Sequence, residues 1–90
     1  MDRNAFEAGL ARDGFDNAGV KEMPPGCHND AHAHDFEVRA LVLEGHIKVV
    51  CAGETRECGP GDVLTMAAGR EHTEDVGADG LKFIVGRKYG

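Results

Sequence analysis

Turn-forming residues divide most of this chain into short segments. Thirteen of its 90 residues are glycine, and glycine- or proline-containing turns separate runs of apolar and β-branched residues. Turn signals spaced about every 8–12 residues are typical of a β-sandwich or β-barrel. The sequence therefore predicts an all-β fold, with strands over residues 15–23, 32–43, 47–51, 55–58, 63–66, 72–76 and 81–85.

The first residues depart from this pattern. Residues 4–12 contain Phe6 and Leu10 four positions apart, on one side of a predicted helix. A helix this short is unstable alone, so we expect it to pack on the sheet or on a second subunit. We assign residues 1–14 to the helix and its ends, and residues 20–86 to a barrel, within a single domain of residues 1–90.

The charge balance argues against two classes of partner. The net charge is −6, whereas nucleic acids and anionic membrane surfaces need a basic protein face. No apolar run is long enough to cross a bilayer, and no signal-peptide pattern is visible at the start. The three cysteines fit no zinc-ribbon spacing, so we expect free thiols and a cytoplasmic location.

Three of the five histidines lie where strands are predicted. His32 and His34 are alternate residues of one predicted strand, so their side chains share a face, about 7 Å apart at the backbone. His72 follows a turn and begins another predicted strand. Converging imidazoles bind divalent transition metals at about 2.0–2.1 Å. A His-x-His pair on an exposed strand is also common without a metal, so this spacing alone leaves both interpretations open.

The wider order of glycines and histidines adds a second argument. It runs Gly26, His32, His34, Gly45, Gly61, Gly69 and His72. This order resembles the two motifs of the cupin superfamily, G-x5-H-x-H-x3-E-x6-G and G-x5-P-x-G-x2-H-x3-N. The resemblance implies a small cupin-type β-barrel, also described as a double-stranded β-helix or jelly roll. It further implies one internal divalent transition metal ion (iron, manganese, nickel, zinc or copper) and a homodimer.

The chain departs from these motifs at three positions. Val38 stands where the first motif has its glutamate ligand, Ala67 replaces the proline, and Val76 replaces the final asparagine. Without the glutamate, three imidazoles remain, which suffices for a catalytic-type site with open positions or for a weaker, vestigial one.

Strand alternation ranks the candidates for a fourth ligand. Glu74 is two residues beyond His72 and shares its face, so it is the first candidate, both as a metal ligand and as a catalytic general base. Water is second and His28 is third. Glu37 is last, because it points away from the first histidine pair unless the strand carries a bulge.

Residues 38–43 are apolar on both faces. Leu41 and Leu43 share the outer face with Arg39, which we expect to form a surface ion pair with Glu37. A strand apolar on both faces is covered on both sides. The helix or a second subunit would supply the cover, and the small size of the chain also favours a homodimer.

Two functions from different classes fit these residues. The first is a metal-dependent enzyme that performs oxygenase, isomerase or lyase chemistry on a small polar molecule. The second is a non-catalytic module that binds or senses a metal or small ligand. The lining of the cavity discriminates between them: several polar groups beside the metal indicate catalysis, whereas an apolar lining indicates binding. The apolar lining would consist of Val38, Val42, Leu64 and Met66.

Overall fold

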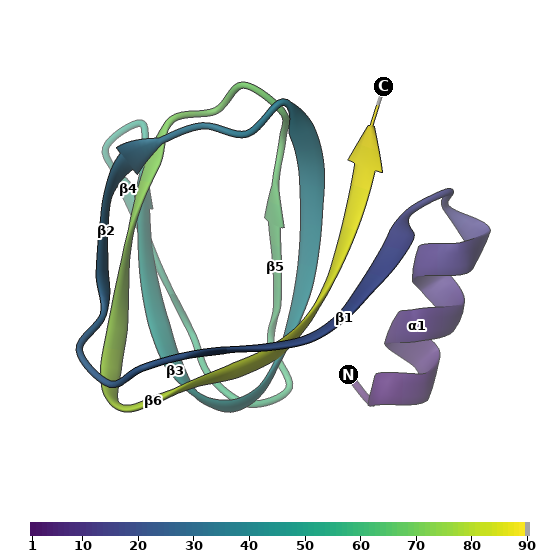
Figure 1. The fold of residues 1–90 in the computed structure, drawn as a ribbon, viewed down its shortest axis with the longest axis horizontal. Coiled ribbons are helices and arrows are strands. Elements are labelled where there is room, and N and C mark those ends of the chain that lie inside the picture. The colour runs from purple at the N-terminus through teal and green to yellow at the C-terminus, as the bar shows by residue number, and fades with distance from the viewer. Residues whose placement is uncertain (90) are drawn as a thin grey trace.

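The computed structural model describes residues 1–89 and shows one helix followed by six strands (Figure 1). All the strand pairs are antiparallel: β6 pairs with β1, β2 and β3, and β3 also pairs with β4 and β5. The sheet curls round on itself, and the helix lies outside it. The predicted all-β barrel with one N-terminal helix is therefore confirmed. Its elements are α1 (Arg3–Arg12), β1 (Asp16–Met23), β2 (His28–His32), β3 (Phe36–Cys51), β4 (Glu54–Cys58), β5 (Val63–Met66) and β6 (His72–Tyr89).

Two predicted turns are bends within long strands. β3 continues through Gly45, and β6 continues through residues 77–80, where the sequence predicted strand ends. The pairing of β3 with β6 shifts register between Val42 and Glu44 and again between Gly45 and Ile47. Such bulges bend a strand without ending it, so the same two strands contribute to both walls of the barrel.

The two bends meet at a pair of glycines. Gly45 and Gly80 both have positive φ, 83° and 77°, a conformation that side chains other than glycine disfavour. A Cβ on Gly45 would overlap the carbonyl oxygen of Gly80. Only glycine at position 45 allows the two strands to cross this closely.

The segment before the first histidine pair also differs from the prediction. Residues 27–30 read as a polar turn, but β2 begins at His28 and pairs with β6. β2 ends at His32, so His34 lies in the connection to β3 and not in the same strand. Polar residues are tolerated in this strand because three of its five residues are exposed to solvent.

Helix α1 covers the outer face of β3 and β6. Phe6 and Leu10 pack on Leu41 and Ile84, and Leu10 and Ile84 are fully buried. Asp2 caps the helix by accepting a hydrogen bond from the backbone N–H of Ala5 at 3.0 Å. The cover that β3 requires is thus present within one chain, and the homodimer stays a prediction that no longer depends on this face.

Arg39 fastens the end of the helix to the sheet. Its Nη1 donates to Asp13 Oδ2 at 2.7 Å, and its guanidinium lies 4.4 Å from the centre of the Phe15 ring. Hydrogen bonds from Arg12 and Arg39 lower the pKa of Asp13 to about 2. The predicted ion pair of Arg39 with Glu37 is therefore wrong, because the helix end supplies a better-placed carboxylate.

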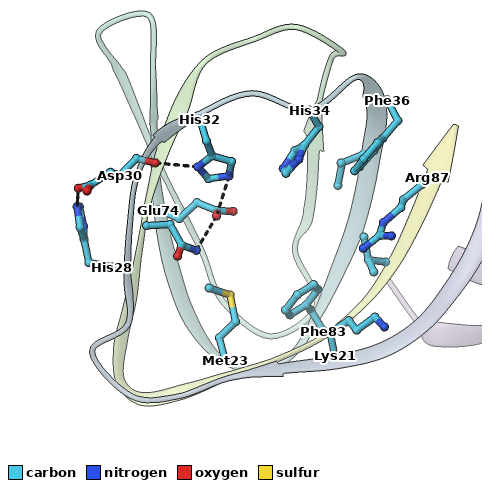
Figure 2. Close-up of a pocket in the computed structure, with 13 residues that line it drawn as sticks. Lys21, Met23, His28, Asp30, His32, His34, Phe36, Glu74, Phe83 and Arg87 are labelled. Carbon is cyan, nitrogen blue, oxygen red and sulfur yellow. Dashed lines mark hydrogen bonds and ion pairs between the residues drawn. The ribbon is translucent and has the colours of Figure 1, made fainter. Parts of the chain in front are cut away.

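The interior of the barrel is filled from one end by an apolar cluster. Its buried members are Val42, Ile47, Val49, Cys58, Val76 and Leu81. Met23 and Phe83 pack against this cluster, and Figure 2 shows both across the pocket from His32 and His34. The three cysteines are free. No helix within residues 1–89 is long and apolar enough to span a bilayer.

Candidate metal centre

Three histidines from separate elements meet at one rim of the barrel. His32 ends β2, His34 lies between β2 and β3, and His72 begins β6. One ring nitrogen from each lies within 4.8 Å of the others. The ring centres are 4.5 Å apart for His32 and His72, 5.0 Å for His32 and His34, and 5.5 Å for His34 and His72. The structure brings all three sequence-predicted imidazoles together, although two of them were expected on one regular strand.

Backbone carbonyls orient two of the three rings. Nδ1 of His32 lies 2.8 Å from the carbonyl oxygen of Asp30, and Nδ1 of His72 lies 3.0 Å from that of Arg70. A carbonyl oxygen can only accept a hydrogen bond, so in each ring Nδ1 donates, and in the neutral ring Nε2 keeps its lone pair. This arrangement is the usual one for histidine metal ligands, whose second nitrogen is held by a carbonyl or carboxylate.

Glu74 lies beside the other ring nitrogen, Nε2, of both histidines. Its Oε1 is 3.5 Å from Nε2 of His32, and its Oε2 is 4.0 Å from Nε2 of His72. The side-chain amide of Asn29 donates to Oε1 at 3.0 Å and holds the carboxylate in place. Two nitrogen lone pairs and a carboxylate repel one another unless a proton or a cation lies between them. The donor set therefore fits a metal cation.

His34 completes the cluster from the opposite side. Burial, followed by the charges of His32 and His72, lowers the pKa of His34 below the usual 6.5. Its ring stacks on Phe36 with a centroid distance of 4.8 Å and an interplanar angle of 18°. A lowered pKa keeps the imidazole neutral near pH 7, which is the form that binds a metal.

The lower-ranked candidates for a fourth ligand lie elsewhere. His28 lines the same pocket, but both of its ring nitrogens are held by carboxylates, with Nδ1 2.6 Å from Asp75 and Nε2 3.0 Å from Asp30, and Figure 2 shows it at the edge of the pocket, apart from the three histidines. Glu37 belongs to a part of β3 that pairs without a register shift, so it points away from the pocket that Val38 lines. The structure therefore excludes the bulge that Glu37 would have needed.

The carboxylates around His28 predict a pH-dependent stability. Hydrogen bonds to Asp75 first, and to Asp30 second, raise the pKa of His28 above 6.5. A raised folded-state pKa adds stability that is fully present below pH 6.5 and is lost as the pH rises through the folded-state value. With a metal chelator present, the melting temperature of His28→Gln should therefore lie furthest below that of the parent at mildly acidic pH. The difference between the two melting temperatures should shrink at alkaline pH. Exposed His46→Gln is the control, and a gap that does not change with pH would contradict this role.

A cavity of about 650 Å³ opens next to the histidines. This volume lies within the range of about 300–1,000 Å³ typical of small-molecule sites. Its wall combines polar side chains (Lys21, Asn29, Glu74 and Arg87) with apolar ones (Met23, Phe36, Val38, Phe83 and Val85). Of the four residues proposed as an apolar lining, it contains Val38, whereas Val42 and Leu64 line an adjoining apolar space that Glu74 and Val38 also border. The polar groups beside the histidines are the feature that the sequence analysis associated with catalysis.

Sequence reasoning missed Lys21 and Arg87. The signal was present in strand alternation: Phe83, Val85 and Arg87 are alternate residues of β6, and all three line the cavity. Lys21 and Met23 alternate in the same way on β1. Finding them required knowing which face of each strand points inward.

The comparisons with known proteins agree with the fold. A family model described as the cupin domain matches residues 19–83. A search of curated proteins finds no match. A Rhizobium leguminosarum protein of unknown function superposes with a TM-score of 0.76 and 20% identity, covering 100% of this chain and 97% of that one.

Two further solved structures share the fold over part of their length. The Cnp3 cupin domain of Schizosaccharomyces pombe superposes with a TM-score of 0.71 and 16% identity, covering 84% of this chain and 60% of that domain. The DMSP lyase DddQ of Ruegeria pomeroyi superposes with a TM-score of 0.69 and 26% identity, covering 77% of this chain and 36% of the lyase. The present chain thus spans less than two thirds of either relative.

Proposed function

Because this chain belongs to the cupin domain family, we propose that it is a metal-dependent enzyme that acts on a small polar molecule. His32, His34 and His72 would hold one divalent transition metal ion, which when bound supplies a Lewis acid. One observation carries the proposal: three imidazole nitrogens lie within 4.8 Å of one another, and two of the rings are already oriented by carbonyls. Ligand atoms around a tetrahedral ion lie about 3.4 Å apart, so small rotations of the rings would close the site.

Glu74 is the residue best placed to move a proton. Its carboxylate is 19% exposed, lines the cavity and is oriented by the amide of Asn29. A carboxylate held in this way can accept a proton from a molecule in the cavity and return it at another atom. Lyases and isomerases need such a base beside the reacting carbon, and one fold neighbour, DddQ, is a lyase. The apolar floor with Met23 and Phe83 would exclude water from that side.

The proposal is tested by the metal content of the protein purified without an affinity tag. Elemental analysis should find about one transition-metal ion per chain, or the metal-free protein should take up about one on titration. Uptake well below one ion per chain under both conditions would contradict the proposed centre.

Replacing Glu74 tests its place beside the ion. Glu74→Gln should weaken metal binding about tenfold or more, because the carboxylate charge next to the ion is lost while the shape is kept. Glu37→Gln removes the same charge from the face of β3 that points away from the cavity, and it should leave the metal affinity unchanged. Competition with a chromophoric chelator measures both constants. Equal affinities of Glu74→Gln and the parent would remove Glu74 from the ligand set.

A further inference from the structure

Arg87 is a partly buried cation in the cavity that has no acidic partner within residues 1–89. Three lysine or arginine side chains within residues 1–89 are partly buried: Arg39, Lys82 and Arg87. Arg39 pairs with Asp13 at 2.7 Å and Lys82 with Glu44 at 3.5 Å. Arg87 forms no salt bridge within the described part of the chain, although the protein is rich in acidic residues. A partly buried charge without a counter-ion is costly, so its retention in a cavity points to an anion from outside.

Lys21 adds a second positive charge to the same wall. It is an exposed residue of β1 that lines the cavity, and it forms no salt bridge within residues 1–89. Figure 2 shows Arg87 and Lys21 across the pocket from His32 and Glu74, with Phe83 beside them. The cavity therefore has a cationic wall facing the candidate metal centre.

The ring of Phe36 lies against both Arg87 and His34, and so limits the distance between the cationic wall and the candidate metal centre. It lies 4.8 Å from the ring of His34 on one side and 5.2 Å from the guanidinium carbon of Arg87 on the other. Arg87 is thus separated from His34 by no more than the sum of these two distances. A small organic molecule that lies along the cavity side of Phe36 spans such a distance. Stacking on Phe36 holds the guanidinium so that its N–H groups are available for a carboxylate.

We infer that Arg87 and Lys21 form a carboxylate-binding subsite, and that the molecule this site takes is a small organic anion. Its carboxylate lies against Arg87 and Lys21, and a second oxygen group at its other end reaches the three histidines. The apolar side chains of Phe83, Val85 and Val38 contact the carbon chain between the two ends. This inference rests on the proposed function for the metal end of the molecule, and on the two cations alone for the other end.

The test uses the dicarboxylates malonate, succinate and glutarate, each compared with its neutral diamide. Calorimetry on the zinc-loaded protein should show at least one diacid binding tenfold or more tightly than its diamide. Arg87→Gln should reduce that affinity about tenfold or more, because a charge-assisted hydrogen-bond pair is lost. Lys21→Gln should cause a smaller loss. Lys88→Gln is the matched control, since it removes the same charge from the next residue of β6, which lies near Phe15 outside the cavity.

A second arm separates this inference from the proposed function. In the metal-free protein, butyrate should bind weakly, and Arg87→Gln should reduce that binding whereas Lys88→Gln should not. Zinc uptake by Arg87→Gln and Lys21→Gln should equal that of the parent, which also shows that both variants fold. If the parent takes up no zinc, the proposed function fails and the butyrate arm still decides the subsite. Diacid and butyrate binding that is the same in Arg87→Gln, Lys21→Gln and the parent would overturn the inference.

Discussion

Replacing His32 and His34 together by alanine is expected to abolish the uptake of a divalent transition metal. The double variant leaves one imidazole, His72, and one carboxylate, Glu74, at the centre, too few protein ligands for a zinc-type site. A metal that binds only the folded state stabilises it by about 2.7 kcal/mol at a free concentration one hundred times Kd. Excess zinc should therefore raise the melting temperature of the parent by on the order of 10 °C and leave that of the variant unchanged.

The matched control removes as many imidazoles from outside the centre. His28 is bound to Asp75 and Asp30, and His46 is exposed, so the variant with both replaced by glutamine should keep about one metal ion per chain. Elemental analysis after dialysis measures metal content, and thermal unfolding with and without zinc measures the coupling to stability. If the His32 and His34 variant retains as much metal as the parent, the site assignment is wrong.

Replacing Gly45 by alanine is expected to destabilise the fold by about 4 kcal/mol or more, which is exceptional for the addition of one methyl group. Position 45 has φ 83°, and a Cβ there would overlap the carbonyl oxygen of Gly80 on β6. The overlapped oxygen belongs to the backbone and cannot rotate away as a side chain would. The overlap is therefore relieved only if the two longest strands separate at their bend. Since small domains are stable by only about 5–15 kcal/mol, much of the protein should be unfolded at 37 °C.

Gly53→Ala separates the close approach of the strands from the cost of the backbone conformation. Gly53 has φ 79°, almost the same as Gly45, but a Cβ there meets nothing within 4 Å. Its replacement should cost only about 1–2 kcal/mol, the penalty of a left-handed conformation. Urea denaturation of both variants and the parent measures the free energies of unfolding. Equal losses for the two variants would show that the crossing of β3 and β6 does not depend on glycine.

The local pattern of the chain was enough to predict the class of fold, whereas the cluster was predicted from the resemblance to the cupin motifs. Alternation and turn residues indicated a barrel of short strands, and the spacing of Phe6 and Leu10 indicated the helix that covers it. The order of histidines and glycines, through its resemblance to the cupin motifs, indicated His32, His34 and His72 as a group. These features are local in sequence, because they depend on strand period, helix period and turn chemistry.

Only the tertiary structure decided how the cluster is assembled and what surrounds it. The sequence predicted turns at Gly45 and residues 77–80, but a glycine with positive φ can equally bend a strand, and the pairing of β3 with β6 determines which occurs. The lone pairs of His32 and His72 face Glu74 because backbone carbonyls bind the other nitrogens of both rings. Arg87 joins Lys21 in one cavity because β6 pairs with β1 and curls toward the rim. The two carbonyl contacts are local, but long-range strand register sets the bends, the approach of both rings to Glu74 and the shared cavity wall. Register depends on the packing of the whole barrel, which no local pattern encodes.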